Sequence, residues 1–65
     1  MNLKNREIQI LTLVARGETS AEIAAYLRLS KRTIDFHLNN ARIKLHAKSR
    51  TQAAVIAVVK GLIKP

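Results

Sequence analysis

The apolar residues of this chain recur at intervals of three and four positions, which is the spacing of one face of an α-helix. Four segments show this pattern in turn, and the sequence therefore predicts helices at residues 5–16, 20–27, 31–45 and 49–59. Connections of two to four residues between them favour a compact all-α domain. We expect one four-helix domain over residues 1–65, with a core formed by three inner faces: Ile10, Leu11 and Val14; Ile23, Ala24 and Leu27; and Ile34, Leu38, Ala41 and Leu45.

Residues that favour helix starts stand at the beginning of three of these segments. Thr19 with Glu22, and Ser49 with Gln52, have the spacing of a capping box, in which two residues bond each other's backbone. Ser30 is a further N-cap candidate, because its hydroxyl can accept a hydrogen bond from the first turn of the helix. These local signals predict where the last three helices begin.

Helices commonly end in a residue with left-handed backbone, and this residue is usually glycine. Gly17 suits that place after the first helix, but Arg28 follows the second helix and His46 follows the third. A residue other than glycine in this conformation costs on the order of 1 kcal/mol. Two interpretations of Arg28 stay open: strain that the fold tolerates, or a cation positioned near phosphates.

The fourth helix is apolar around most of its circumference, in the run AAVIAVV at residues 53–59. A helix of this kind is usually buried on more than one side. Three short helices can cover one face, so the second face needs a partner. We expect Val55 and Val59, one turn apart, to form a dimer interface; the alternative is an overlong apolar face lying loosely against Leu62 and Ile63.

The charge of the chain is strongly positive, with twelve Lys and Arg residues against four Asp and Glu and a formal net charge of +8. This balance suits a polyanionic partner. Seven of the basic residues lie between Arg28 and Arg50, where Asp35 is the single acid. No cysteine is present, and we expect neither a metal site nor a cofactor. The longest apolar stretch is too short to span a bilayer, and no secretion signal opens the chain.

Residues 19–45 combine these signals. Two short helices are joined by a tight turn at Arg28 and Leu29, and the second helix is basic at its entry and at its exit. This is the layout of a helix-turn-helix, in which one helix braces the DNA backbone and the next enters the major groove. The segment therefore predicts a domain that binds double-stranded DNA.

Short motifs are spread over nearly the whole chain: Arg6-Glu7, Ala15-Arg16-Gly17, Glu22-Ile23-Ala24, Leu27, Ser30, Thr33-Ile34, His37, Asn40, Lys44-Leu45 and Ser49-Arg50. In order and spacing they resemble the LuxR-type (GerE-like) DNA-binding domain of bacterial transcription regulators. The resemblance implies a cytoplasmic, nucleoid-associated regulator. Residues 33–37 (TIDFH) and 61–63 (GLI) resemble the quorum-sensing branch, which senses acyl-homoserine lactones, more than the NarL-like response regulators.

The chain departs from this family pattern at three positions. Lys4 stands where the family has a threonine cap, so Asn2 or Asn5 is expected to cap the first helix instead. Arg28 and His46 replace two turn glycines. No ligand-sensing or phosphoacceptor domain accompanies the motifs, and both a free-standing domain and a fragment cut on its N-terminal side stay open.

The resemblance assigns the third helix to the major groove, with base contacts from Asp35, Phe36 and Asn39. The chemistry fits, because Asn pairs bidentately with adenine, Asp accepts from the cytosine amino group and Phe contacts the thymine methyl. Phe36 packing on the second helix and Asn39 lying on a solvated face are the alternatives. Contacts to the DNA backbone, including free N–H groups at the starts of the second and third helices, are expected from Thr19, Ser20, Lys31, Arg32, Thr33, His37, Lys44, Lys48, Ser49 and Arg50.

Three classes of function fit these features. The first is a sequence-specific transcription regulator that binds a two-fold site as a homodimer through the fourth helix, with RNA polymerase as a further candidate partner. The second is a membrane-active cationic peptide, against which the clustering of basic residues at helix entries and the absence of tryptophan both argue. The third is an interaction module or anti-activator that pairs with a full-length regulator through the fourth helix. An enzyme is not expected, because no nucleophile–base pair or carboxylate pair shares a face.

Overall fold

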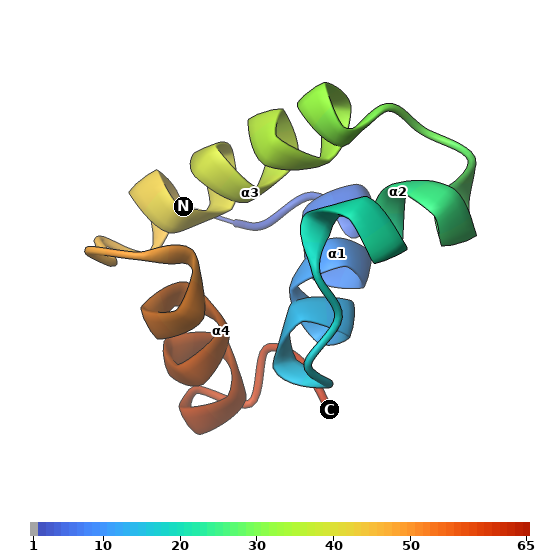
Figure 1. Ribbon diagram of the computed structural model, residues 1–65. Helices are drawn as coiled ribbons and strands as arrows, with labels where there is room; N and C mark the ends of the chain where they lie inside the picture. The colour runs from blue at the N-terminus through green and yellow to red at the C-terminus, as the bar shows by residue number, and fades with distance from the viewer. Residues whose placement is uncertain (1) are drawn as a thin grey trace.

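Residues 2–65 are described by the computed structural model, and within this range the chain forms four helices (Figure 1): α1 Asn5–Ala15, α2 Ser20–Leu27, α3 Lys31–Lys44 and α4 Arg50–Val59. The all-α fold class is confirmed, and each predicted boundary lies within one residue of the observed one. Helix α1 contacts all three other helices. Helix α3 does the same, so α1 and α3 together connect α2 and α4 to one core.

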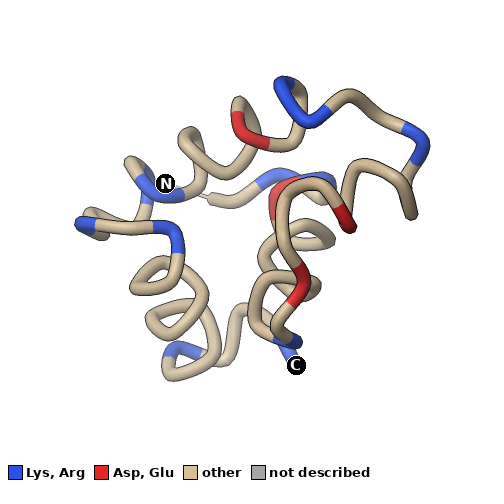
Figure 2. The backbone as a smooth tube through the Cα atoms, in the orientation of Figure 1, with Lys and Arg blue, Asp and Glu red and all other residues tan. Residues whose placement is uncertain are grey.

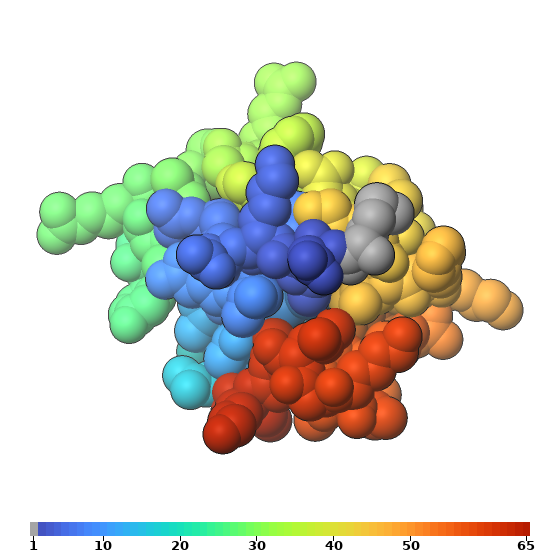
Figure 3. Space-filling model, turned by 180° about the vertical axis from the view of Figure 1, so that it is seen from behind, coloured from blue at the N-terminus to red at the C-terminus, as the bar shows by residue number. Residues whose placement is uncertain are grey.

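The core lies where the inner faces of the four helices meet. Ile10, Leu11, Ile23 and Ile34 have no exposed surface, and the predicted faces are confirmed except that Val14, Leu27 and Leu45 are only partly buried, at the edge of the core. The segment after α4 turns back and buries Ile63 in the same core. Figure 3 shows this segment and α1 together forming the back of the molecule.

The predicted starts of α2 and α3 are confirmed. The Thr19 hydroxyl accepts a hydrogen bond from the Glu22 N–H at 3.1 Å, and the Glu22 carboxylate accepts one from the Thr19 N–H at 2.8 Å. The Ser30 hydroxyl accepts from the Thr33 N–H at 3.0 Å. Each bond satisfies an N–H group that the first turn of a helix leaves without a backbone partner.

Helix α4 begins as predicted at Ser49, but only half of the capping box is present. The Ser49 hydroxyl accepts from the Gln52 N–H at 3.0 Å. The Gln52 side-chain oxygen accepts from the N–H of Lys48, one residue before the expected donor.

The predicted start of α1 is wrong in its cap. The N-cap position is Lys4 itself, with extended backbone, and Asn5 is already inside the helix. The Glu7 carboxylate reaches back and accepts a hydrogen bond from the Lys4 N–H at 2.8 Å. The expected asparagine cap is absent, and a carboxylate in the first turn satisfies the N–H of the N-cap residue.

Each helix is followed by a residue with left-handed backbone, namely Gly17, Arg28, His46 and Gly61, with φ values of +95°, +57°, +55° and +71°. The next N–H in each case bonds a carbonyl five residues earlier, for example Leu29 to Ala24 at 3.0 Å and Ala47 to Arg42 at 3.0 Å. These bonds are typical of the Schellman motif. The predicted left-handed backbone of Arg28 and His46 is confirmed.

Within the described part of the chain, no helix combines the length and apolarity that a bilayer-spanning segment needs.

Candidate nucleic-acid interface

The starts of α2, α3 and α4 supply one shared pocket. Its lining combines the first turn of α2, the first turn of α4 and Lys31 from α3, in the set Val14, Gly17, Glu18, Thr19, Ser20, Ala21, Lys31, Arg50 and Thr51. Helix starts carry partial positive charge, and the charged side chains that line the pocket are two cations, Lys31 and Arg50, and one carboxylate, Glu18. The pocket therefore has a net positive lining, which suits an anion.

Only some backbone N–H groups at these helix starts are free to bind an anion. The N–H groups of Thr19 and Thr33 are taken by Glu22 and Ser30, so the expectation that both offer free N–H groups is wrong. The N–H groups of Ser20, Lys31 and Arg32 have no hydrogen-bond partner within residues 2–65. On α2, the unpaired donor at Ser20 comes one residue after Thr19. On α3, the unpaired donors at Lys31 and Arg32 come two residues and one residue before Thr33.

The side chain of Asp35 joins the three helix starts. Its Oδ1 accepts from the Ser20 hydroxyl at 2.8 Å and from the Arg50 Nη1 at 3.4 Å, and its Oδ2 lies 3.4 Å from the Lys31 Nζ. Arg50 Nη2 also donates to the Ser20 hydroxyl, whose side chain is buried. The hydrogen bond from Ser20, followed by the contact with Lys31 and the charge of Arg50, holds the pKa of Asp35 below its usual value. We refer to Ser20, Lys31, Asp35 and Arg50 as the Asp35 cluster.

The predicted base contact of Asp35 stays a prediction, but the carboxylate already has three donors from the protein. Figure 2 shows this setting: one acidic position on α3, with basic positions at both ends of the helix. Three residues predicted to contact the DNA backbone, Ser20, Lys31 and Arg50, therefore surround Asp35, which was predicted to contact a base.

The outer face of α3 is exposed in the region predicted to read bases. Phe36 is 62% exposed, lies outside the core, and has its ring edge-on to the His37 ring at 5.5 Å between centroids. Both the base contact and the alternative, packing on the second helix, stay predictions. Asn39 is exposed, but its Oδ1 accepts from Arg42 at 3.3 and 2.8 Å. The Asn39 amide nitrogen can donate at once, whereas bidentate pairing with adenine requires the Arg42 guanidinium to move.

Arg42 is a residue of this face that the sequence reasoning missed. Its guanidinium holds Asn39 and also donates to the carbonyl oxygen of Ala47 at 3.2 Å, in the turn after α3. The spacing of three residues between Asn39 and Arg42 was the available signal, since side chains so spaced are neighbours on a helix surface. Arg42 thereby fixes the orientation of a predicted base-contacting residue.

Lys44 lies at the other end of α3 with a different partner. Its Nζ is 2.8 Å from the Glu7 carboxylate, and the two side chains are only 18% and 1% exposed. Burial alone would raise the pKa of Glu7, but the hydrogen bonds from Lys44 and from the Lys4 N–H outweigh it, and the pKa is lowered. This pair ties α3 to α1, so the ammonium predicted to contact DNA is engaged inside the protein.

The remaining predicted backbone contacts have varied positions. Arg32 and Lys48 are exposed, Ser49 caps α4, and His37 is half-buried beside Phe36. No group of three His, Cys, Asp or Glu residues in the described range could hold a metal ion. Of the predicted backbone contacts, the exposed cations Lys31 and Arg32 lie at the start of α3, and Lys48 lies just before α4.

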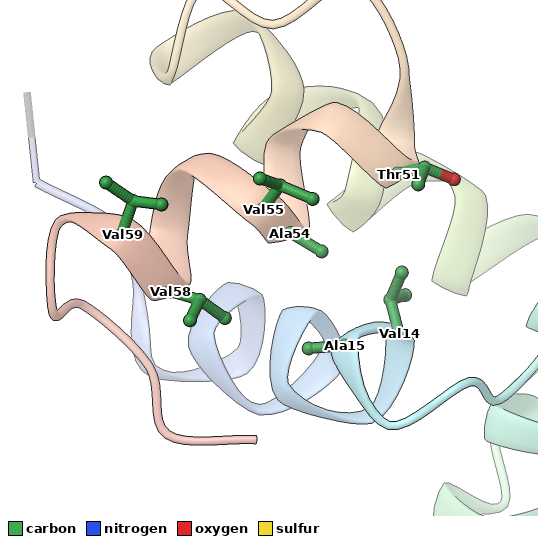
Figure 4. Close-up of a pocket in the computed structure, with 7 residues that line it drawn as sticks. All are labelled: Val14, Ala15, Thr51, Ala54, Val55, Val58 and Val59. Atoms are coloured by element: carbon green, nitrogen blue, oxygen red, sulfur yellow. The ribbon is translucent and has the colours of Figure 1, made fainter.

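A second surface is apolar and lies between α1 and α4 (Figure 4). It is lined by Val14, Ala15, Thr51, Ala54, Val55, Val58 and Val59. Helix α4 buries its alanines and exposes its valines: Ala53, Ala54 and Ala57 are in the core, whereas Val59 is 80% exposed. Ile63 is buried in the core and does not cover Val59, so the predicted outer valine face is uncovered in the single chain.

Comparison with known proteins agrees with these features. Residues 1–57 match the family described as "Bacterial regulatory proteins, luxR family". The regulatory protein SdiA of Escherichia coli (strain K12) is 46% identical over 63 residues, which cover 97% of this chain and 26% of SdiA. The transcriptional activator protein SolR of Ralstonia solanacearum is 44% identical over 61 residues, covering 94% of this chain and 26% of SolR.

A relative from another bacterium has a similar identity. The uncharacterized transcriptional regulatory protein YhcZ of Bacillus subtilis (strain 168) is 45% identical over 60 residues, which cover 92% of this chain and 28% of YhcZ. The chain spans about a quarter of the length of these relatives. Since the family match covers most of the chain and includes the whole helix-turn-helix, the chain belongs to the luxR family of bacterial regulatory proteins.

Proposed function

We propose that this chain is a sequence-specific binding domain for double-stranded DNA in a bacterial transcription regulator, with α3 in the major groove. The observation that supports this most directly is the exposed face of α3. It lies next to the starts of α2 and α3, which carry unpaired N–H groups and cations. In a helix-turn-helix, N–H groups and cations bind phosphates while the adjoining helix surface meets the bases. The relatives' names, which include transcriptional activator and regulatory proteins, point to the same function.

The proposed contacts divide into base contacts and backbone contacts. Phe36 meets a thymine methyl, and Asn39 donates from its amide to a purine. Lys31, Arg32 and Lys48 provide exposed cations for phosphates, and the N–H of Ser20 adds a backbone donor. Contacts by the side chains of Thr19, Thr33, His37, Ser49 and Lys44 stay predictions, of which Lys44 has the least accessible charge.

DNA binding should depend steeply on salt. About four to six phosphate contacts per protomer give a log–log slope of affinity against salt of roughly −4 to −5. Fluorescence anisotropy with a labelled duplex, between low and physiological salt, measures this slope. An affinity that hardly changes, or stronger retention on anionic liposomes than on DNA, would contradict the proposal and favour a membrane-active peptide.

We propose further that the domain binds as a homodimer through the uncovered valines of α4. Val55 and Val59 lie one turn apart and are exposed, and DNA readers of this class commonly pair on two-fold sites. So small a surface predicts weak association of the isolated domain.

Val55→Glu should abolish cooperative binding to a two-fold site and leave the helical circular dichroism spectrum unchanged. Gln9→Glu places the same charge on an exposed position of α1 and serves as the matched control. Sedimentation at millimolar concentration and binding to single and paired half-sites measure the difference. Independent binding to half-sites by the unaltered chain would show that the valines are not a dimer interface.

The same valine face also supports a second function, in which the chain pairs with a full-length regulator and acts as an anti-activator. Titrating the chain into a preformed complex of such a regulator with its DNA separates the two functions. A homodimeric DNA reader competes for the DNA site, whereas an anti-activator removes the regulator and leaves the DNA free.

The proposal extends to the biological setting of the domain. Residues 33–37 and 61–63 support the quorum-sensing branch, and the function implies a cytoplasmic location on the nucleoid, with RNA polymerase as a partner at the promoter. Selection of bound sites from random duplexes would identify the operator, whose distance from promoter elements tests the contact with polymerase.

A further inference from the structure

The Asp35 cluster is not explained by base reading or by core packing. One carboxylate receives a hydroxyl donor from α2, an ammonium from its own helix and a guanidinium from α4. Hydroxyl, ammonium and guanidinium groups are the donors that proteins direct at DNA phosphates. The set of donors around Asp35 is therefore the set that a phosphate oxygen would need.

The position of the cluster strengthens this correspondence. Lys31, Ser20 and Arg50 also line the pocket between the starts of α2 and α4, where the N–H of Ser20 is free. A phosphate arriving there would meet the same cations from the open side. Asp35 and a phosphate thus compete for Lys31 and Arg50.

The exposure of each member shows which contacts can be exchanged. Lys31, Asp35 and Arg50 have side chains that are 66%, 43% and 41% exposed, so water and ions reach both ion pairs. Exposed pairs at 3.4 Å are weak, and a phosphate can replace the carboxylate at little cost. Ser20 is buried and its hydroxyl keeps its hydrogen bond to Asp35, so the carboxylate stays in place when the cations leave. Arg50 then gives up its bond to the Ser20 hydroxyl as well as its contact with Asp35.

We propose that the Asp35 carboxylate takes the place of a DNA phosphate in the free domain, and that Lys31 and Arg50 exchange it for a phosphate when the domain binds DNA. The inference rests on the proposed function. In this role Asp35 positions both cations before binding and lowers the affinity for every duplex to a similar degree. It sets the overall affinity of the domain, whereas a base-reading aspartate would set the preference at one base pair.

Asp35→Asn tests the exchange, because asparagine keeps the shape and the acceptor for Ser20 but removes the charge. Random-sequence duplex should bind about three- to tenfold more tightly, as expected from the loss of two weak ion pairs that compete with DNA. Gln9→Lys raises the net charge by the same unit on α1, outside the cluster, and should change the affinity less than twofold. An Asp35→Asn affinity no greater than that of Gln9→Lys overturns the proposal.

Two further readouts separate this role from the alternatives. Sites selected by Asp35→Asn should have the same base preferences as those selected by the unaltered chain; a relaxed preference at one position would make Asp35 a base-reading residue instead. In the unaltered chain, the NMR signals of the Arg50 guanidinium should shift when random duplex is added, and unchanged signals at saturation overturn the exchange even if the variant does not fold. If the unaltered chain binds no duplex at all, the proposed function itself is wrong, and the exchange of cations falls with it.

Discussion

The two ends of α3 are held to the rest of the domain by ionic contacts of opposite character. At the C-terminal end, Lys44 and Glu7 meet at 2.8 Å, and the pair is almost completely buried. At the N-terminal end, Asp35 meets Arg50 and Lys31 at 3.4 Å, and all three side chains are substantially exposed. Both contacts connect α3 to another helix, but only the second is open to solvent.

Burial decides what each contact can do. Removing one partner of a buried pair leaves a charge that water cannot reach, which makes the Glu7–Lys44 pair a structural element. Exposed pairs contribute little to stability because water compensates for their loss. The Asp35 cluster can therefore release its cations to a ligand, and one helix combines a fixed end with an end that can exchange partners.

Loss of the buried pair should give the largest effect. Lys44→Met is expected to lower the free energy of unfolding by about 2–4 kcal/mol, because the charge of Glu7 is left uncompensated. Lys31→Met at the exposed end should lower it by no more than about 0.5–1 kcal/mol. Urea denaturation measures both variants. Equal losses would remove the distinction between the two ends, and a large fall in DNA affinity of the folded Lys44→Met variant would restore Lys44 as a backbone contact.

The pH dependence of stability should separate the same two ends. The pKa of Glu7 in the folded state lies below its ordinary value of 4.5, so its contribution is present above about pH 4.5 and is lost as the pH falls through the folded-state pKa. The thermal stability of the unaltered chain should therefore fall below pH 4.5, and Glu7→Gln should flatten this dependence. Asp35→Asn should flatten it less, since Asp35 is exposed. The reverse order would assign the acid sensitivity to the Asp35 cluster.

The turns that precede and follow α3 should give the smallest effects. Arg28 and His46 both have left-handed backbone, which glycine adopts without strain. Arg28→Gly is expected to raise the free energy of unfolding by up to about 1 kcal/mol, and His46→Gly by less, because histidine tolerates this conformation better than arginine. Gly17→Ala is the matched control and should destabilise by about 1 kcal/mol. Destabilisation by Arg28→Gly would mean that the arginine side chain makes a stabilising contact.

The helices and their ends could be predicted because they depend on neighbours within about five residues. The capping bonds of Thr19 and Ser30 follow from sequence spacing, and so do the left-handed turns at Arg28 and His46. The same local reasoning was wrong for the start of α1, where the Glu7 carboxylate replaces an asparagine cap. The contact that was missed is also between near neighbours, because Glu7 accepts from the N–H of Lys4, only three residues before it.

The functional surface could be predicted only in outline. The sequence predicts α3 as the reading helix and places seven of the twelve Lys and Arg residues between Arg28 and Arg50, since charge and helical periodicity are visible along the chain. It could not show that Asp35 bonds Ser20 and Arg50, each fifteen residues away, or that Lys44 meets Glu7 across thirty-seven residues. Several charged residues of similar type compete for each such partner, and nothing in their spacing selects one.

By itself, therefore, the sequence determined four helices, their boundaries, their apolar faces and the family to which they belong. Only the tertiary structure decided which charges are committed to the protein and which remain available to DNA. The physical reason is the range of the interactions: backbone hydrogen bonds and helical periodicity act over a few residues, whereas burial and ion pairing depend on packing between distant segments. For Asp35 and Lys44, that packing gives each charged side chain partners inside the protein.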